Sequence, residues 1–503
     1  MTYCYFLRVN KCHLVVVLCS FLAIFGLVQC QPAKDTPAPS VPVLPVEADF
    51  SYSAEKYVTN TNIRFKNSSQ NATIYVWDFG DGSVSGEAEP THQYAQMGIY
   101  YITLTASDAQ GNKKSLQKEV RINPQGNFQQ SVVVVLDTTL VKDLHQSLNV
   151  WFNDMVNDGY RVVMHPRLEQ QPIDLRKRIQ TYFTDLTPRL EGVLFVGQTP
   201  IPSAQYIYPP STPYRGLSMQ FYMDLDGQFT NAGQPANMAI DAHTGRVETE
   251  IWTSILPFYQ SKAQTIASIR DYLTKNHAYR TQVTQLQKGF IKPVLGSRIT
   301  TEALYASQYK IIRDEYYTAL AKRGNFYVGI DNTLGDLARF PTSQVSYEQE
   351  MLTNKYDVAS IGAHGNTVSF GSFNEWGSIL IDVNYARRAA IKPVFLLEHS
   401  CNTAAIDNTP NLGTEFLYNK ANNVLIFAGA TAPQGGMGQT ALGRADQLEA
   451  RLLTEGSSIG TAHFAPMTMP YTVENFKSFR EAYSAQQIML GDGTLRLQEF
   501  LKR

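Results

Sequence analysis

The sequence is poor in cysteine and has no excess of charge of either sign. It holds five cysteines in 503 residues, and four lie within the first 30, so that Cys401 alone lies in the body of the chain. The 43 basic and 44 acidic side chains give a formal net charge of −1, which excludes the basic footprint of a nucleic-acid-binding protein. A chain of this length, 44% hydrophobic, is expected to fold into more than one domain.

The first 30 residues have the pattern of an export signal. Arg8 and Lys11 give a positively charged start, and residues 13–28 are mostly apolar but short for a membrane span. The segment ends at Cys30 and resembles a bacterial lipoprotein signal, in which that cysteine becomes the lipidated N-terminus. The alternatives are an ordinary signal peptide and a retained anchor. We predict an exported lipoprotein at the outer membrane or cell surface.

If Cys30 is lipidated, Cys401 is the remaining thiol of the mature chain, and no intramolecular disulfide can form. A lone thiol in an exported protein is a candidate nucleophile. The alternative is a buried cysteine that acts as a small hydrophobic residue.

Residues 31–46 are rich in proline and predict an extended linker. Residues 47–123 predict a small all-β module, because short runs alternate apolar and polar side chains with turn residues between them. The predicted strands are 49–52, 62–65, 73–77 and 100–105.

The stretch 75–82 of this module reads Tyr-Val-Trp-Asp-Phe-Gly-Asp-Gly and resembles the PKD domain, an immunoglobulin-like β-sandwich. The resemblance implies that Trp77 fills the core between two sheets and that the module is a spacer or a binding platform. Asp78, Asp81 and His92 suggest a metal site, but turn hydrogen bonding is the preferred interpretation.

From residue 128 onward, apolar strands alternate with amphipathic helices, which predicts parallel sheets covered by helices. We expect two α/β subdomains, about 128–285 and 286–503, as two adjacent sheets or one large sheet. The predicted strands are 131–136, 160–164, 192–197, 289–294, 326–330, 358–363, 394–397 and 424–428, and the predicted helices are 143–157, 175–183 and 302–322.

Two of these strands end in groups that can carry chemistry. One apolar run ends in His364-Gly365, and another ends in Cys401. Ligands of open α/β sheets bind at the carboxyl ends of the strands. The interval of 401 − 364 = 37 residues holds a loop, a helix and the next strand. We therefore expect His364 and Cys401 at the same edge of a sheet.

The region 128–503 resembles the gingipain family of cysteine peptidases, in the clan that also holds caspases and legumains. The resemblance rests on the His-Gly strand, the Cys strand and further stretches in the family's order: 194–202, 222–227, 424–431 and 490–496, the last with Gly493 in place of proline. It implies a caspase-like α/β catalytic region that hydrolyses peptide bonds through a thioester. The resemblance also implies that the enzyme requires no cofactor and that its partners are protein or peptide substrates.

The resemblance and the residue types together assign the catalytic roles. Cys401 is the nucleophile, and His364 is the base that takes its proton. Backbone N–H groups of Gly365 and Cys401 form the oxyanion hole. Glu250 aligns with the acidic residue that orients the imidazole, and a surface carboxylate is the alternative. His399 shares a strand face with Cys401 and is a competing base, a pocket wall or a core histidine.

Substrate preference and metal binding are less constrained. Gingipain-like enzymes often cleave after Arg or Lys, but the loop 432–438 offers no aromatic wall for such a pocket. Asp224 and Asp226 have the spacing of calcium ligands, and a simple turn is the alternative.

The functional hypotheses are a surface-tethered cysteine endopeptidase, an inactive gingipain-like binding protein and an adhesin that uses the PKD domain. We expect the peptidase.

Overall fold

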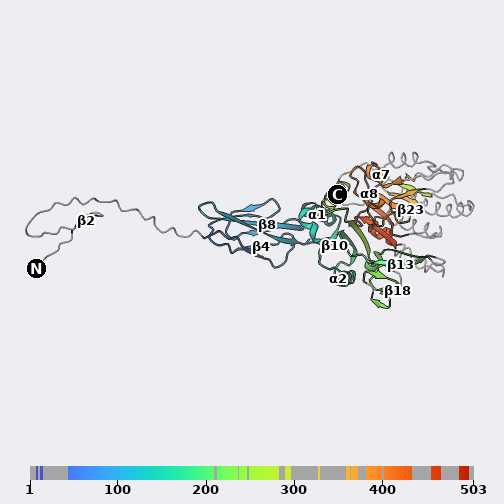
Figure 1. Ribbon diagram of the computed structural model, residues 1–503, viewed down its shortest axis with the longest axis horizontal. Helices are drawn as coiled ribbons and strands as arrows, with labels where there is room; N and C mark the ends of the chain where they lie inside the picture. Colours follow the sequence, from blue (N-terminus) through green and yellow to red (C-terminus); the bar gives the residue numbers. More distant parts are fainter. Residues whose placement is uncertain are drawn as a thin grey trace, which may run out of the picture.

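The computed structural model describes two regions that lie end to end, a β-module and an α/β region, with helix α1 (Thr138–Asn157) where they meet (Figure 1). Near the N-terminus, β1 (Leu7–Val9) and β2 (Cys12–Leu14) pair antiparallel. None of the helices in the described part of the chain is long and apolar enough to span a membrane. The described residues are 7–9, 12–14, 44–208, 212–235, 237–245, 248–281, 289–295, 327–328, 358–362, 364–371, 381–398, 401–432, 455–465 and 486–497.

The β-module consists of two antiparallel sheets. One contains, in order, β3 (Phe50–Ser53), β4 (Ile63–Asn67) and β7 (Thr91–His92), and the other β6 (Val84–Ser85), β5 (Ile74–Asp78), β8 (Gly98–Ser107) and β9 (Lys113–Ile122). The predicted strands are confirmed with small shifts at their ends. Strand β9 was missed because its first half is polar and exposed, which hides the alternation.

Trp77 lies fully buried between the two sheets, as the PKD resemblance implied. Its ring meets that of Phe50 edge-on, with centroids 5.1 Å apart. The Asp81 carboxylate accepts the N–H of Ser83 at 3.0 Å and lies 2.7 Å from Nε2 of His92. These contacts are hydrogen bonds of a turn and of its neighbouring strand, in agreement with the preferred interpretation of this motif.

The β-module is fixed to the α/β region where β8 meets α1. The buried side chains of Met97 and Ile99 belong to the core of the α/β region, although both residues lie in the β-module sequence. Asn149 of α1 accepts the Ile99 N–H at 2.8 Å and donates to the Ile99 carbonyl at 3.0 Å. Asn153 donates to the Met97 carbonyl at 2.9 Å. The two regions are therefore packed together at this junction.

The α/β region is built on one ten-stranded sheet. Among its described strands, all neighbours pair in parallel except β27 and β28. The sheet therefore has two parallel halves that run in opposite directions. In order across the sheet, the strands are β11 (Tyr160–Arg167), β10 (Gln130–Asp137), β12 (Leu190–Gly197), β19 (Trp252–Pro257), β28 (Gln487–Gly491), β27 (Ile426–Ala430), β26 (Phe395–Glu398), β22 (Val358–Gly362), β20 (Gly289–Leu295) and β21 (Tyr327–Val328).

Helices cover both faces of this sheet. The chain passes from β10 through α1 to β11 and returns through α2 (Pro172–Asp185) to β12 on the other side of β10. Because such crossovers are right-handed, α1 and α2 lie on opposite faces. Helix α4 (Lys262–Thr281) contacts α1 and also α8 (Leu412–Tyr418). The predicted helix 302–322 lies outside the described residues.

Asp492, directly after β28, ties two helices to the sheet. Its fully buried carboxylate accepts from Trp151 Nε1 of α1 at 2.6 Å and from Asn276 Nδ2 and Arg280 Nη2 of α4 at 2.9 and 2.6 Å. Arg280 also pairs with Asp158 at the end of α1. Burial opposes ionisation, but Arg280 and the hydrogen bonds outweigh it, so the pKa of Asp492 lies below its usual value.

We expect Asp492→Asn to lower the free energy of unfolding by about 3–5 kcal/mol at neutral pH, because it breaks a buried ion pair. Since the native pKa lies below the unfolded value of about 3.9, Asp492 stabilises the fold above that pH. This stabilisation is lost as the pH falls through the native pKa. Denaturant unfolding at neutral and acid pH measures the difference, with the exposed Asp174 (57%) changed to Asn as control. An undiminished effect in acid would contradict the assignment.

We expect Asn149→Ala to cost about 1–3 kcal/mol, because it leaves the Ile99 N–H and carbonyl without their partners. The loss should appear in calorimetry as a separate, earlier transition of the β-module. Gln146→Ala, at an exposed position of the same helix, is the matched control. A single transition at the wild-type temperature in Asn149→Ala would show that the junction does not depend on this side chain.

Candidate active site

The carboxyl ends of β22 and β26 lie side by side at one edge of the sheet. The two strands are parallel neighbours, and Ile361 of β22 pairs with Glu398 of β26. His364 follows Ile361 by 364 − 361 = 3 residues, and Cys401 follows Glu398 by 401 − 398 = 3 residues. The two predicted catalytic residues therefore follow the last paired positions of two neighbouring strands by the same number of residues.

His364 begins a β-hairpin made of β23 (His364–Asn366) and β24 (Ser369–Gly371). Oδ1 of Asn366 accepts the N–H groups of Val368 and Ser369, both at 2.9 Å, and so fixes the turn. Gly365, a predicted oxyanion donor, pairs with Phe370 across the hairpin. The backbone that carries His364 and Gly365 is thus held in regular structure.

Cys401 is half-buried and opens a tight turn after β26. The next residue, Asn402, has a φ of 58°, in the left-handed region where asparagine is enriched among non-glycine residues. The Asn402 N–H donates to the Ala432 carbonyl at 3.3 Å, and the Ala404 N–H donates to the Ala430 carbonyl at 3.0 Å. The turn is therefore anchored to the carboxyl end of β27.

Helix α8 starts between the hairpin and this turn. The Leu412 N–H donates to the carbonyl of Thr367, in the hairpin turn, at 2.8 Å. The Gly413 N–H donates to the carbonyl of Thr403, two residues after Cys401, at 2.9 Å. One helix end therefore contacts both candidate catalytic segments.

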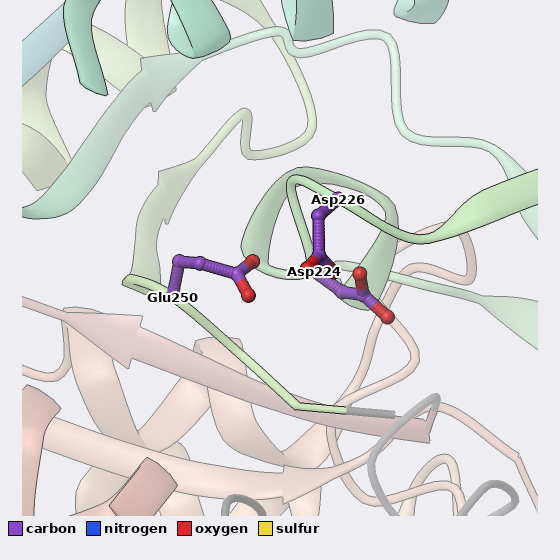
Figure 2. Close-up of side chains that lie close together, drawn as sticks. All are labelled: Asp224, Asp226 and Glu250. Atoms are coloured by element: carbon purple, nitrogen blue, oxygen red, sulfur yellow. The ribbon is translucent and has the colours of Figure 1, made fainter. Parts of the chain in front are cut away.

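Glu250 precedes β19, which runs opposite to β26, so it lies at the same edge of the sheet as Cys401. Three strand spacings separate β19 from β26, about 14 Å. The Glu250 carboxylate accepts the Leu225 N–H at 2.5 Å, and Figure 2 shows the side chain reaching toward the turn that carries Asp224 and Asp226. Burial, and then these neighbouring carboxylates, raise the pKa of Glu250.

The structure brings Glu250 together with the two predicted calcium ligands, with one oxygen of each within 4.8 Å of the others. The contacts of this group are those of a turn. Asp224 accepts the Gly227 N–H at 2.6 Å and lies 2.9 Å from Nε2 of His243. The Arg176 guanidinium binds the Asp224 and Gly227 carbonyls at 2.7 and 2.8 Å. Asp224 Oδ1 and Glu250 Oε2 are engaged by backbone N–H groups of the turn, whereas Asp224 Oδ2 is buried without a hydrogen-bond partner among the described residues, so calcium at this group stays a prediction.

Sequence reasoning missed the residues that hold the candidate site. Asn402 carried a signal, since asparagine tolerates the left-handed region better than most residues. Leu412 and Gly413 carried none, because they act through backbone N–H groups that every residue except proline has. His399, the competing base, and the predicted pocket loop 433–438 lie outside the described residues.

Residues 40–123 match the sequence model of the PKD domain family. The β-module is a PKD domain. The chain is 37% identical over 70 residues to Collagenase ColA of Bacillus cereus and 40% identical over 53 residues to Pre-pro-metalloprotease PrtV of Vibrio cholerae. These matches cover 13% and 10% of this chain but only 7% and 6% of the two relatives. The chain is thus similar to a small part of each.

Among solved structures, the chain is similar to gingipain R (RGPB), described as an Arg-specific cysteine proteinase. The TM-score is 0.50 at 13% sequence identity, and the match covers 73% of this chain and 78% of that chain. The α/β region has the gingipain fold. The predicted fold class, a PKD β-sandwich followed by a gingipain-like α/β region, is therefore confirmed.

We expect Asn402→Val to lower the free energy of unfolding by about 1–2 kcal/mol, because a Cβ is unfavourable in the left-handed region and a β-branched side chain more so. Asn402→Gly is the matched variant, since glycine adopts this φ without strain, and it should keep wild-type stability. Denaturant unfolding of both variants tests this. Equal stabilities of the two would mean that the backbone at Asn402 is not constrained.

Proposed function

We propose that this protein is a cysteine endopeptidase that hydrolyses peptide bonds in protein or peptide substrates with Cys401 and His364. The observation that carries the proposal is the equal three-residue offset of these residues beyond the paired positions Ile361 and Glu398. Their shared edge is where open α/β sheets bind ligands. The gingipain fold of the region supports the same assignment.

The proposed reaction needs only three kinds of group from the protein: a thiol, an imidazole and backbone N–H groups. His364 accepts the proton of Cys401, whose thiol would otherwise be mostly protonated at neutral pH with a pKa of about 8.5. The thiolate attacks the substrate carbonyl carbon, and the N–H groups of Gly365 and Cys401 stabilise the oxyanion. The C–N bond breaks as His364 gives its proton to the leaving amine, and a thioester remains. His364 then deprotonates a water that attacks the thioester, and the C–S bond breaks to release the acid and the thiolate.

The pair Cys401 and His364 is the catalytic unit of this proposal. The orienting role of Glu250 stays a separate prediction, because the Glu250 carboxylate accepts the Leu225 N–H and is placed by that turn. Glu250→Gln keeps this acceptor and removes the charge. If Glu250 orients His364 electrostatically, this variant should lower kcat. If Glu250 only fixes the turn at 224–227, it should not.

We expect Cys401→Ala and His364→Ala each to lower hydrolysis of peptides by roughly 10³-fold or more, because each removes one member of a pair that acts as a unit. The measurement is cleavage of a peptide library varied at the residue before the cut, in reductant, with and without calcium. Cys30→Ala, a cysteine change far outside the pair, is the control and should retain cleavage. Hydrolysis that persists in Cys401→Ala would refute the assignment, and the library would name the preferred residue.

Surface attachment is proposed separately, from the lipoprotein-like pattern that ends at Cys30. The same Cys30→Ala protein tests it, since expression with a labelled fatty acid should mark the wild-type protein and leave the variant unmarked. Label on both proteins, or on neither, would contradict lipid attachment at Cys30.

A binding role of the PKD domain is the second candidate function. Its outer sheet face exposes three apolar side chains, Ile74, Val76 and Val84, at 54, 50 and 70%. Apolar side chains gathered on an exposed face are a common feature of interaction sites. Absence of cleavage by both wild type and Cys401→Ala would favour this role and an inactive gingipain-like region.

A further inference from the structure

The first turn of α8 places each of its backbone donors on a specific acceptor. The first N–H groups of a helix have no partner within the helix. In α8, the Leu412 N–H goes to Thr367, the Gly413 N–H goes to Thr403, and the Thr414 N–H is capped by Oδ1 of Asn411 at 2.9 Å. The first two N–H groups of the helix therefore bind carbonyls in two other segments of the chain.

Those two segments are the ones that carry the proposed catalytic pair. Thr367 lies three residues after His364, in a hairpin turn fixed by Asn366. Thr403 lies two residues after Cys401 and is fully buried. Because Leu412 and Gly413 are joined by one peptide bond, the two acceptor carbonyls are held at a short and constant separation.

The helix end is itself pressed onto the sheet, so it cannot shift without disturbing the core. A Cβ on Gly413 would lie 2.7 Å from the ring of Phe427 in β27 and 2.9 Å from Leu490 in β28. Leu412 is fully buried, and Asn411 is 1% exposed. The first turn of α8 is thus packed in a fixed place against β27 and β28, the antiparallel pair of the sheet.

We propose that residues 411–414, the first turn of α8, form a positioning element that holds the His364 hairpin and the Cys401 turn in register for proton transfer. This inference rests on the proposed function. A base must lie within about 2.6–3.2 Å of the atom whose proton it takes, and a displacement of about 1 Å can cost 10²-fold in rate. The two backbone hydrogen bonds from Leu412 and Gly413 supply that precision.

The test compares Leu412→Pro with Leu412→Ala. Both lose the buried leucine side chain, but only the proline variant loses the N–H that binds Thr367. Proline suits this position, because it is the first residue of the helix and Asn411 before it is extended, with φ −129° and ψ 150°. The readouts are kcat and KM on the peptide found in the library, and the pH profile of Cys401 alkylation by iodoacetamide, followed by mass spectrometry.

We expect Leu412→Pro to have about ten-fold lower kcat than Leu412→Ala with an unchanged KM. The apparent pKa of the Cys401 thiol should rise in the proline variant toward the ordinary value of about 8.5, because the imidazole is no longer held beside it. Identical kinetics and identical alkylation profiles in the two variants would overturn the inference.

A second pair keeps the test decisive if the proline variant does not fold. Asn411→Ala removes the cap, whereas Asn411→Ser keeps an uncharged acceptor for the Thr414 N–H. The alanine variant should show the raised thiol pKa and the serine variant the wild-type profile, and equal profiles would again overturn the inference. The result is different if the proposed pair of Cys401 and His364 is itself wrong. In that case His364→Ala would leave the pH profile of Cys401 alkylation as it is in the wild type.

Discussion

The buried charge pair of Asp492 and Arg280 is the constraint on which the rest of the fold depends. It lies directly after β28, the strand where the two parallel halves of the sheet meet. Through Trp151 it holds α1, which carries the contact to the PKD domain, and through Asn276 and Arg280 it holds α4. A buried ion pair is stabilising only if its partners stay in place. Both helices and β28 are therefore held by one carboxylate.

Much of the fold could be predicted, because apolar runs and helical spacing are local signals. The carboxyl-end rule for parallel strands likewise put His364 and Cys401 at one edge, and the register of Ile361 and Glu398 agrees with that expectation. The choice between two sheets and one could not be predicted. It depends on the pairing of β28 with β19 through Ile255 and Leu490, and with β27 on its other side, and no local pattern encodes a pairing across more than 200 residues. Leu225, whose N–H the Glu250 carboxylate accepts, lies 25 residues earlier in the chain, which is too far for a strand or helix period to relate the two positions.

The contacts of Gly493 explain one departure from the gingipain-like pattern. Where the family has proline, Gly493 donates its N–H to Oγ of Ser254 at 3.1 Å, and a Cβ there would lie 2.6 Å from the ring of Trp252. Proline offers no N–H and would collide with the tryptophan. Ser254 and Trp252 both lie in β19, the strand that pairs with β28. Glycine at this position therefore lets the backbone after β28 pack closely on β19.

The packing of β8 on α1 fixes where the PKD domain stands relative to the α/β region. Since Asn149 pairs with the Ile99 backbone as a neighbouring strand would, the PKD domain cannot swing freely about a hinge at that point. Any partner held on the exposed apolar face of the PKD domain would then stand at a constant distance from the carboxyl ends of β22 and β26.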